Sequence, residues 1–243
     1  MKSKILFSIL GISILLSSCK TPNIAVSDDL KFETSVFDVT GRHGWKFNKV
    51  ISYGDYKTSK IKQGWIKSYD IGFVARFQGA EQKLGFIQNT PDQMQAEVLA
   101  VSHFKNNEIA LLDGFLSYNI EYDNSYAGTI VMSHNPEHIW DFVIYEPEGS
   151  FPDYTDCGIA KDQFGNEISI HGIKKLEGYQ SWPQYENFGF EFRFNEEPIA
   201  AVSTMNKGRV WIKNDLHPDL KLVVSSLSTS LLVRESLIEH TSN

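Results

Sequence analysis

The amino-acid sequence predicts an all-β fold with one buried apolar helix, a closed antiparallel β-barrel around a C-terminal central helix. Two observations support this prediction. Short segments rich in β-branched and aromatic residues, bounded by Gly, Asn, Asp or Pro, recur along most of the chain. A single apolar segment, residues 216–236, follows them near the C-terminus. The alternative is a β-sandwich with this helix packed on its outside. Strands do not alternate with helices, which argues against a doubly wound sheet.

The first residues have the pattern of an exported bacterial lipoprotein. Lys2 and Lys4 precede an apolar stretch, residues 5–16, that is too short to span a bilayer as a helix. Leu-Ser-Ser then leads to Cys19, which resembles a lipobox. That resemblance implies cleavage before Cys19 and acylation of its thiol and new amino group, for example with palmitate. Several acyl chains anchor a protein stably. The alternative is an ordinary signal peptide with an incidental cysteine. We therefore expect three regions: a lipoprotein signal peptide at 1–18, a lipidated tether at 19–31 and a single barrel domain at 32–243.

Charge and cysteine content narrow the function classes. The formal charge of −7 becomes −9 when Lys2 and Lys4 leave with the signal peptide. Nucleic acids are bound through clustered Lys and Arg, so the acidic balance argues against such a partner. The only cysteines are Cys19 and Cys157, and acylation of Cys19 leaves no internal disulfide. The 225 residues that remain after cleavage (243 − 18) suffice for one all-β domain.

The expected strands are short and separated by turn residues. They are residues 35–41, 44–56, 69–77, 83–88, 117–123, 126–133, 139–146, 166–173, 188–197, 199–205 and 208–214. In the clearest case Glu191 and Arg193 share one face, and the other face carries Phe188, Phe190, Phe192 and Phe194. We expect turns at Gly165-Asn166, at Asn206 to Gly208 and within 122–128.

One interior segment, "TPDQMQAEVLAVSHF", has helical signals. Thr90 can cap a helix, Pro91 suits its first position, and Gln93 can close a capping box. Met94, Val98 and Val101 then fall on one face. Residues 96–104 also fit a strand, but the capping signals favour a helix here.

The C-terminal segment predicts a helix that is buried on all sides. Pro218 suits the first turn, and Asp219 and Arg234 complement the helix dipole at the two ends. Between these two residues the only charge is Lys221, and the gaps between apolar residues hold Ser and Thr. A helix that is apolar all round lies in a core or a bilayer. The twelve residues 222–233 span about 18 Å, which is too short for a bilayer and suits a protein interior.

The final block of the chain resembles the tubby C-terminal-like fold, shared by tubby proteins, plant LURP-one-related proteins and phospholipid scramblases. The residues that carry the resemblance are 190–194, 199–203, 208–212 and the helix from Leu216 onward, with the 165–166 hairpin and the opening 37–47 similar in kind. The resemblance implies a closed barrel threaded by the helix. Tubby proteins bind phosphoinositide head groups through surface Lys and Arg, but those positions find no match here. The calcium-binding segment of scramblases also finds no match. Fold alone does not fix function.

The usual catalytic and nucleotide-binding motifs are absent from the sequence, and we predict no cofactor and no metal. His134 and His138 are four residues apart, but Pro136 lies between them, and two exposed loop histidines are expected. Cys157 and His171 flank the expected hairpin, with Asp156 or Asp162 nearby. They suggest a catalytic Cys-His-Asp set. The simpler interpretation is that these residues are close only because the hairpin pairs their strands.

Two further groups of residues suggest ligand sites. The loop 146–156 carries Glu146, Glu148, Asp153 and Asp156. Its carboxylates suggest calcium binding or glycoside hydrolysis, and the aromatic residues nearby suggest sugar stacking: Trp140, Phe151, Tyr154 and Trp182-Pro183. The simpler interpretation is a solvated loop with aromatic residues that belong to the core. The second group is Arg42, Lys46 and Lys49, with His43 among them, in an otherwise acidic chain. This group suggests a site for an anionic lipid head group. The simpler interpretation is a strand face that is exposed to solvent.

The sequence therefore leads to two hypotheses. The first is a non-enzymatic envelope lipoprotein, anchored through Cys19 and expected in the outer membrane, that binds a lipid or amphiphile or scaffolds envelope proteins. The second is an envelope hydrolase or carbohydrate-binding protein acting on glycan or peptide. The position of the apolar helix separates them, because a helix inside the barrel moves any site to the outer surface or rim.

Overall fold

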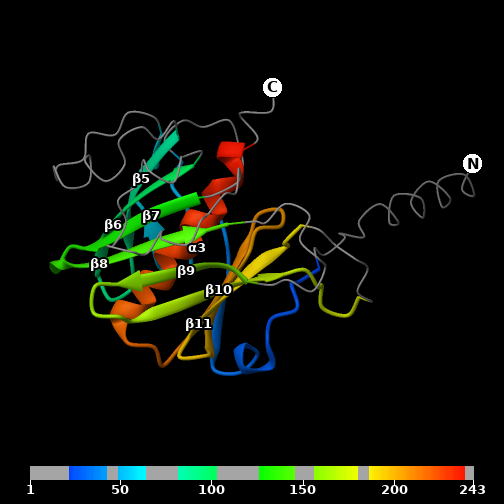
Figure 1. Cartoon of the computed structure of the whole chain (residues 1–243). Helices are drawn as coiled ribbons and strands as arrows, with labels where there is room; N and C mark the ends of the chain where they lie inside the picture. Colours follow the sequence, from blue (N-terminus) through cyan, green and yellow to red (C-terminus); the bar gives the residue numbers. More distant parts are fainter. Residues whose placement is uncertain are drawn as a thin grey trace, which may run out of the picture.

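The computed structural model describes residues 22–42, 49–63, 82–102, 126–145, 156–179 and 186–238. Nearly all of the regular structure in these ranges is β-strand, with one long helix (Figure 1). The elements are η2 (Asp28–Leu30), β1 (Thr34–Asp38), β2 (Ser52–Tyr53), β3 (Tyr56–Thr58), β4 (Lys62–Gln63), β5 (Gln82–Asn89), β6 (Gln95–Ser102), β7 (Tyr126–Met132), β8 (Asn135–Ile144), β9 (Asp156–Asp162), β10 (Glu167–Ile173), β11 (Gly189–Phe194), β12 (Glu197–Ser203), β13 (Arg209–Lys213) and α3 (Pro218–Ile238).

The strands form one antiparallel sheet that closes on itself almost completely. The strand order is β1-β13-β12-β11-β10-β9-β8-β7-β6-β5-β3-β2, with β4 also paired to β5. Most neighbours in the sheet are therefore neighbours in the chain. The two ends of this path meet at a bridge between Thr40 and Ser52. There, Thr40 N donates to Ser52 O at 2.8 Å and Ser52 N donates to Thr40 O at 3.1 Å. The arrangement confirms the predicted barrel.

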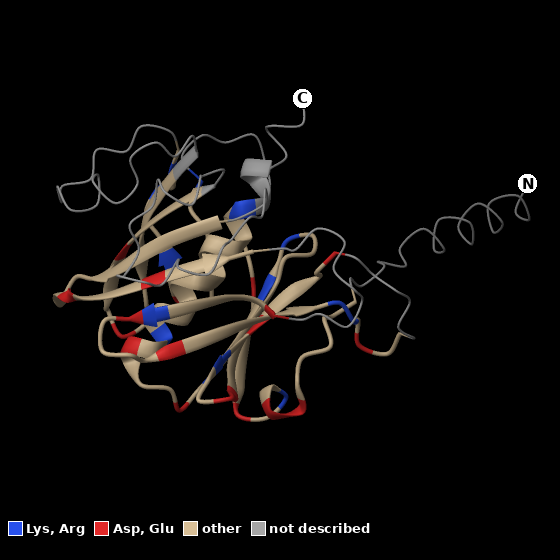
Figure 2. Ribbon diagram, in the orientation of Figure 1, with Lys and Arg blue, Asp and Glu red and all other residues tan. Residues whose placement is uncertain are grey.

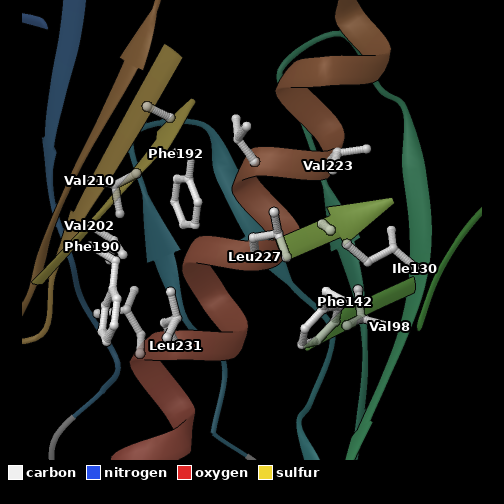
Figure 3. Close-up of a cluster of buried hydrophobic side chains, with 14 of the residues drawn as sticks. Val98, Ile130, Phe142, Phe190, Phe192, Val202, Val210, Val223, Leu227 and Leu231 are labelled. Atoms are coloured by element: carbon white, nitrogen blue, oxygen red, sulfur yellow. The ribbon is translucent and has the colours of Figure 1, made fainter. Parts of the chain in front are cut away.

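The helix α3 fills the barrel. Residues 222–234 are buried without interruption, so every side of the helix faces protein over about 20 Å. Figure 3 shows Leu227 between two groups of side chains from opposite walls. One wall supplies Phe192, Val202 and Val210, and the other supplies Val98, Ile130 and Phe142. The alternative of a sandwich with an external helix is therefore wrong. Within the described part of the chain, no helix is long and apolar enough to cross a membrane.

Most of the described hydroxyl groups of the helix have hydrogen-bond partners inside the barrel, whereas Ser230 Oγ is buried without one. Ser226 Oγ donates to Leu222 O at 2.8 Å, and Ser228 Oγ donates to Val224 O at 2.7 Å. In such bonds the hydroxyl pairs with a backbone carbonyl of the same helix, so the serine presents only a small side chain to the barrel wall. Thr229 Oγ1 instead donates to Gln88 Oε1 on β5 at 2.8 Å, and so connects the helix to the wall. Ser225, Ser226 and Ser228 thus let the surrounding strands approach closely while their own hydroxyl groups stay hydrogen-bonded.

The helix expected near residue 90 is wrong. Residues 91–93 form a turn in which Gln93 has φ +60°, and residues 95–102 form β6. The predicted capping residue is used in the turn, because Gln93 N donates to Thr90 O and Thr90 N donates to Met94 O. Pairing with β5 and β7 makes strand the favoured conformation, with Val98 among the alternate residues that point to the core. This tertiary context overrides the local helical signal.

Some of the other local predictions are confirmed, one is wrong, and some lie outside the described residues. The turns at Gly165 and Gly208 are confirmed, with φ +90° and +89°. Phe190 and Phe192 face the helix as expected. Phe188 lies before β11 and packs in a separate cluster outside the barrel, so it does not share their face. The strands expected at 69–77 and 117–123 lie outside the described residues, as does most of the 122–128 turn.

Residues 22–31 do not run free from the barrel, and we call them the N-terminal arm. Ile24 and Leu30 are fully buried against the outer face of the sheet, in a cluster with Ile173, Ala201 and Trp211. The arm also pairs with the chain after β10: Ala25 N donates to Lys175 O at 2.9 Å, and Glu177 N donates to Asn23 O at 2.9 Å. The boundary between tether and domain at residue 32 stays a prediction, although residues 22–31 pack on the barrel. The arm packs there because its two apolar side chains cover an apolar patch of the sheet.

Candidate functional site

The helix fills the interior, so a ligand site would have to lie on the outer surface or the rim. Of the predicted basic group, the structure describes Arg42 and Lys49. Arg42 is only 8 % exposed. Its Nε donates to Leu232 O in α3 at 2.9 Å, and its Nη1 donates to Asn206 O at 2.8 Å and to Thr204 O. Lys49 Nζ donates to the backbone carbonyl of Arg42 at 3.1 Å. Arg42 therefore joins the helix to the loop before β13, and the head-group site at Arg42, Lys46 and Lys49 stays a prediction. Lys46 and His43 lie outside the described residues.

Replacing Arg42 with Lys tests this structural role. A single ammonium cannot reach the carbonyls of both the helix and the 204–206 loop. We expect the free energy of unfolding to fall by about 1.5–3 kcal/mol, the range for hydrogen bonds to charged groups. Lys207→Gln, at an exposed position of the same loop, is the control and should stay within about 0.5 kcal/mol of the parent. Chemical denaturation measures both variants, and equal stability of the two would contradict the role.

The two histidines of the β7–β8 region do not converge. His134 Nε2 lies 3.1 Å from Asp219 Oδ1 at the start of α3, whereas His138 Nε2 lies 2.9 Å from Asp162 Oδ2 at the end of β9. His134 is exposed in a turn as expected, but His138 lies within β8 and is mostly covered. Among the described residues, no group of three His, Cys, Asp or Glu side chains could hold a metal ion.

Asp162 organises the turn between β9 and β10. Its Oδ1 accepts hydrogen bonds from the backbone N–H of Phe164 and Asn166, and its Oδ2 accepts from the side chains of Asn166 and His138. Burial alone would raise the pKa of this carboxyl. The hydrogen bonds from Asn166, His138 and the backbone outweigh burial and hold the pKa below its usual value.

This depressed pKa predicts an acid-sensitive contribution to stability. The contribution is fully present above the unfolded pKa of about 3.9 and is lost as pH falls through the lower folded value. We expect Asp162→Asn to destabilise the protein by about 1–3 kcal/mol at pH 7. The difference between the variant and the parent should shrink toward pH 3. Urea denaturation at several pH values measures it, and a difference that stays constant with pH would contradict the assignment.

The predicted Cys-His-Asp set is not formed. Cys157 is buried in the core, where its Sγ accepts a hydrogen bond from Asn187 Nδ2 at 3.4 Å. His171 points to the outer face and pairs with Asp156, with Nδ1 2.9 Å from Oδ1. A β-bulge explains the difference. The pairing of Lys161 with Glu167 would place Cys157 opposite His171, but the register shifts after Ile170 and brings Asp156 there.

The bulge assembles a polar cluster on the outer face of the barrel, formed by Asp156, Ser169, His171, Glu191 and Arg193. His171 Nε2 lies 2.9 Å from Ser169 Oγ, two residues earlier on β10. On β11, Arg193 stands opposite Ser169 and Glu191 stands opposite His171. Arg193 donates from Nε and Nη2 to Glu191 Oε1 at 3.0 and 2.8 Å, and Glu191 Oε2 accepts from Ser27 N in the arm at 3.0 Å. We call this set the outer-face cluster.

Its chemistry follows from the order of contacts. Asp156 at Nδ1 fixes the imidazole tautomer that leaves Nε2 free to accept the Ser169 proton. That is the order of contacts that activates a serine. The backbone groups of β10 bond to β9 and β11, so an oxyanion would need a side-chain donor, and Arg193 is the nearest candidate. The sequence offered one signal: Ser169 and His171 are two residues apart on a strand and must share a face.

The remaining candidate residues are core residues or lie outside the described ranges. Trp140 is 2 % exposed and packs in the core. The loop residues 146–155 and the Trp182-Pro183 pair lie outside the described ranges. Asp156, at the end of that loop, belongs to the outer-face cluster. The sugar-stacking surface therefore stays a prediction, without the contribution of Trp140.

No family model, no curated protein and no solved structure matches the chain. The resemblance to the tubby C-terminal-like fold therefore stays a prediction at the level of the family.

Proposed function

We propose that the protein is an envelope lipoprotein, anchored in the membrane through Cys19 and located in the outer membrane. Its barrel is a non-enzymatic module that binds a lipid or amphiphile, or holds envelope proteins together, through its outer surface. The observation that carries this proposal is the packing of α3, whose residues 222–234 occupy the barrel interior. A ligand of such a barrel meets its outer surface or its rim, as a scaffold's partners do.

The two cysteines offer a direct test of the anchor. The protein is expressed in a bacterial host with an alkyne fatty acid and then fractionated. The parent is expected to incorporate the fatty acid and to sediment with membranes. Cys19→Ala is expected to lose both properties, because the acyl chains supply the membrane affinity. Cys157→Ala is the matched control. Because Cys157 is buried, its replacement should leave the fatty-acid labelling unchanged. Labelling that survives in Cys19→Ala would overturn the proposal.

A second candidate function is hydrolysis, and the outer-face cluster is the observation that favours it. Ser169 Oγ would attack an acyl carbonyl, and His171 would take the proton and pass it to the leaving group. Water, deprotonated by His171, would then hydrolyse the acyl-serine ester, release the carboxylic acid and restore the Ser169 hydroxyl. A fluorophosphonate probe tests this activity. Labelling of the parent but not of Ser169→Ala would support it, with Ser35→Ala as a control for a surface serine that bonds Asn214. An unlabelled parent would exclude it.

A further inference from the structure

We propose that the N-terminal arm holds one particular end of the barrel against the bilayer, so that the turn Leu176–Tyr179 lies at the lipid surface. The proposal rests on the proposed acylation of Cys19. It adds the orientation of the domain, and hence which surface meets lipid head groups and which faces away from the membrane.

The first step is the length of free chain. With the arm packed from Ile24 onward, only five residue steps separate Cys19 from the barrel surface. An extended chain covers at most about 3.3–3.6 Å per residue, so this connection spans no more than about 18 Å. A tether that stayed free to Lys31 would have twelve steps and could reach about 40 Å. Packing of the arm therefore removes more than half of the reach and keeps the barrel close to the membrane.

The second step is the place where the arm begins. Ile24 bridges to Leu176 just after β10, and Asn23 accepts a hydrogen bond from Arg209 at the start of β13. Ile173, Gly189, Ser203 and Arg209 follow one another across the sheet and mark one end of the barrel, which we call the arm end. The opposite end, the hairpin end, carries the turns at 91–93, 133–134, 163–166 and 195–196 and the first turn of α3. The α3 helix of 21 residues extends about 31 Å between these ends. An 18 Å connection that starts at the arm end is too short for the barrel to stand on its hairpin end, which would place the arm end about 31 Å from the bilayer.

The third step is the surface chemistry of the two ends. At the arm end, Tyr179 is 65 % exposed, and two lysines (Lys175 and Lys207) and two glutamates (Glu177 and Glu186) are also exposed. Tyrosine is enriched at membrane interfaces, and each Lys near an anionic surface contributes about 1 kcal/mol of attraction. The hairpin end instead presents acidic residues, which Figure 2 shows along its turns. Exposed ones are Asp92, Glu137, Glu167, Glu196, Glu197 and Asp215. An anionic membrane therefore repels the hairpin end more strongly than the arm end, where the two lysines offset the two glutamates.

Two labelled positions test the orientation. The full-length acylated protein, with Cys157→Ala, receives an environment-sensitive fluorophore at Tyr179→Cys or at Glu196→Cys, its counterpart on the hairpin end. Each protein is reconstituted in vesicles of phosphatidylethanolamine and phosphatidylglycerol that contain a head-group quencher. We expect strong quenching of the fluorophore at position 179 and little quenching of the fluorophore at position 196. Equal quenching at both positions, or stronger quenching at 196, would overturn the inference.

A spacer variant isolates the role of the arm without disturbing the fold. A Gly/Ser insertion of about ten residues between Thr21 and Pro22 adds roughly 17 Å of reach while the arm stays packed. We expect quenching at position 179 to fall while the protein still sediments with the vesicles. Unchanged quenching would contradict a positioning role for the short connection. A parent protein that is not acylated and stays in the supernatant would instead refute the proposed anchor, so the two failures are distinguishable.

Discussion

Replacement of Leu227 with Asp is expected to prevent the chain from folding, and Leu227→Ala is expected to lower the free energy of unfolding by about 2–5 kcal/mol. Leu227 has no exposed surface and lies at the middle of α3 between opposite walls of the barrel. An aspartate there would bury a carboxyl group among the apolar side chains that Figure 3 shows, which is costly whether the group stays ionised or takes up a proton. The alanine leaves a cavity that the closed sheet cannot easily collapse to fill.

Val36→Ala is the matched control for the alanine variant. Val36 lies on β1, is 51 % exposed, and should tolerate the change within about 0.5 kcal/mol. Urea denaturation followed by circular dichroism measures both. A loss of less than 1 kcal/mol in Leu227→Ala, similar to that of Val36→Ala, would show that this face of the helix does not contact the barrel wall.

The second large effect is expected at Gly41, beside the bridge that closes the barrel. Gly41 has φ +83°, a conformation that costs other residues roughly 1–2 kcal/mol. A Cβ at this position would also lie 1.9 Å from the carbonyl oxygen of Val50. Because that atom belongs to the backbone before β2, Gly41→Ala must displace the strand segment that meets Thr40. We expect a loss of about 3 kcal/mol or more, at the upper end for single substitutions.

Gly165→Ala separates the two causes. Gly165 has φ +90°, almost the same as Gly41, but a Cβ there meets nothing within 4 Å. It should therefore show only the conformational cost of about 1–2 kcal/mol. Thermal and urea denaturation of the two variants give the comparison. If Gly41→Ala were no less stable than Gly165→Ala, the close approach at the closure of the barrel would be contradicted.

The sequence predicted those parts of the fold that depend on local pattern. The all-round apolar helix could be recognised because a helix without a polar face has to be buried, and its uninterrupted apolar stretch is too short for a bilayer span. Gly165 and Gly208 marked turns because they adopt positive φ, which other residues reach only at a cost. The segment after Thr90 was assigned wrongly because its capping pattern is equally compatible with a tight turn. Pairing with two neighbouring strands, which the local sequence does not contain, decided the outcome.

The outer-face cluster and Arg42 could not be predicted for the same reason. Whether Cys157 or Asp156 stands opposite His171 depends on one bulge in β9, and a shift of one residue exchanges the two faces of a strand. Arg42 looked like part of a basic surface because its partners are backbone carbonyls, which carry no signal in the sequence. The arm was assigned to the tether because Ile24 and Leu30 are isolated apolar residues in a polar stretch. Only the apolar patch around Trp211 gives them a binding surface.

The central claim is that α3 lies inside the barrel, and four single cysteines test it most directly. Val223, Val224, Ser225 and Ser226 are consecutive, fully buried and about 100° apart around the helix, so together they sample its whole circumference. Each is replaced by Cys in a Cys19→Ala, Cys157→Ala background, and its reaction with a maleimide is timed under native and denaturing conditions. We predict that all four thiols are unreactive in the folded protein and fully reactive in urea. Rapid reaction at one or two adjacent positions of the folded protein would place the helix on the outside and contradict the account.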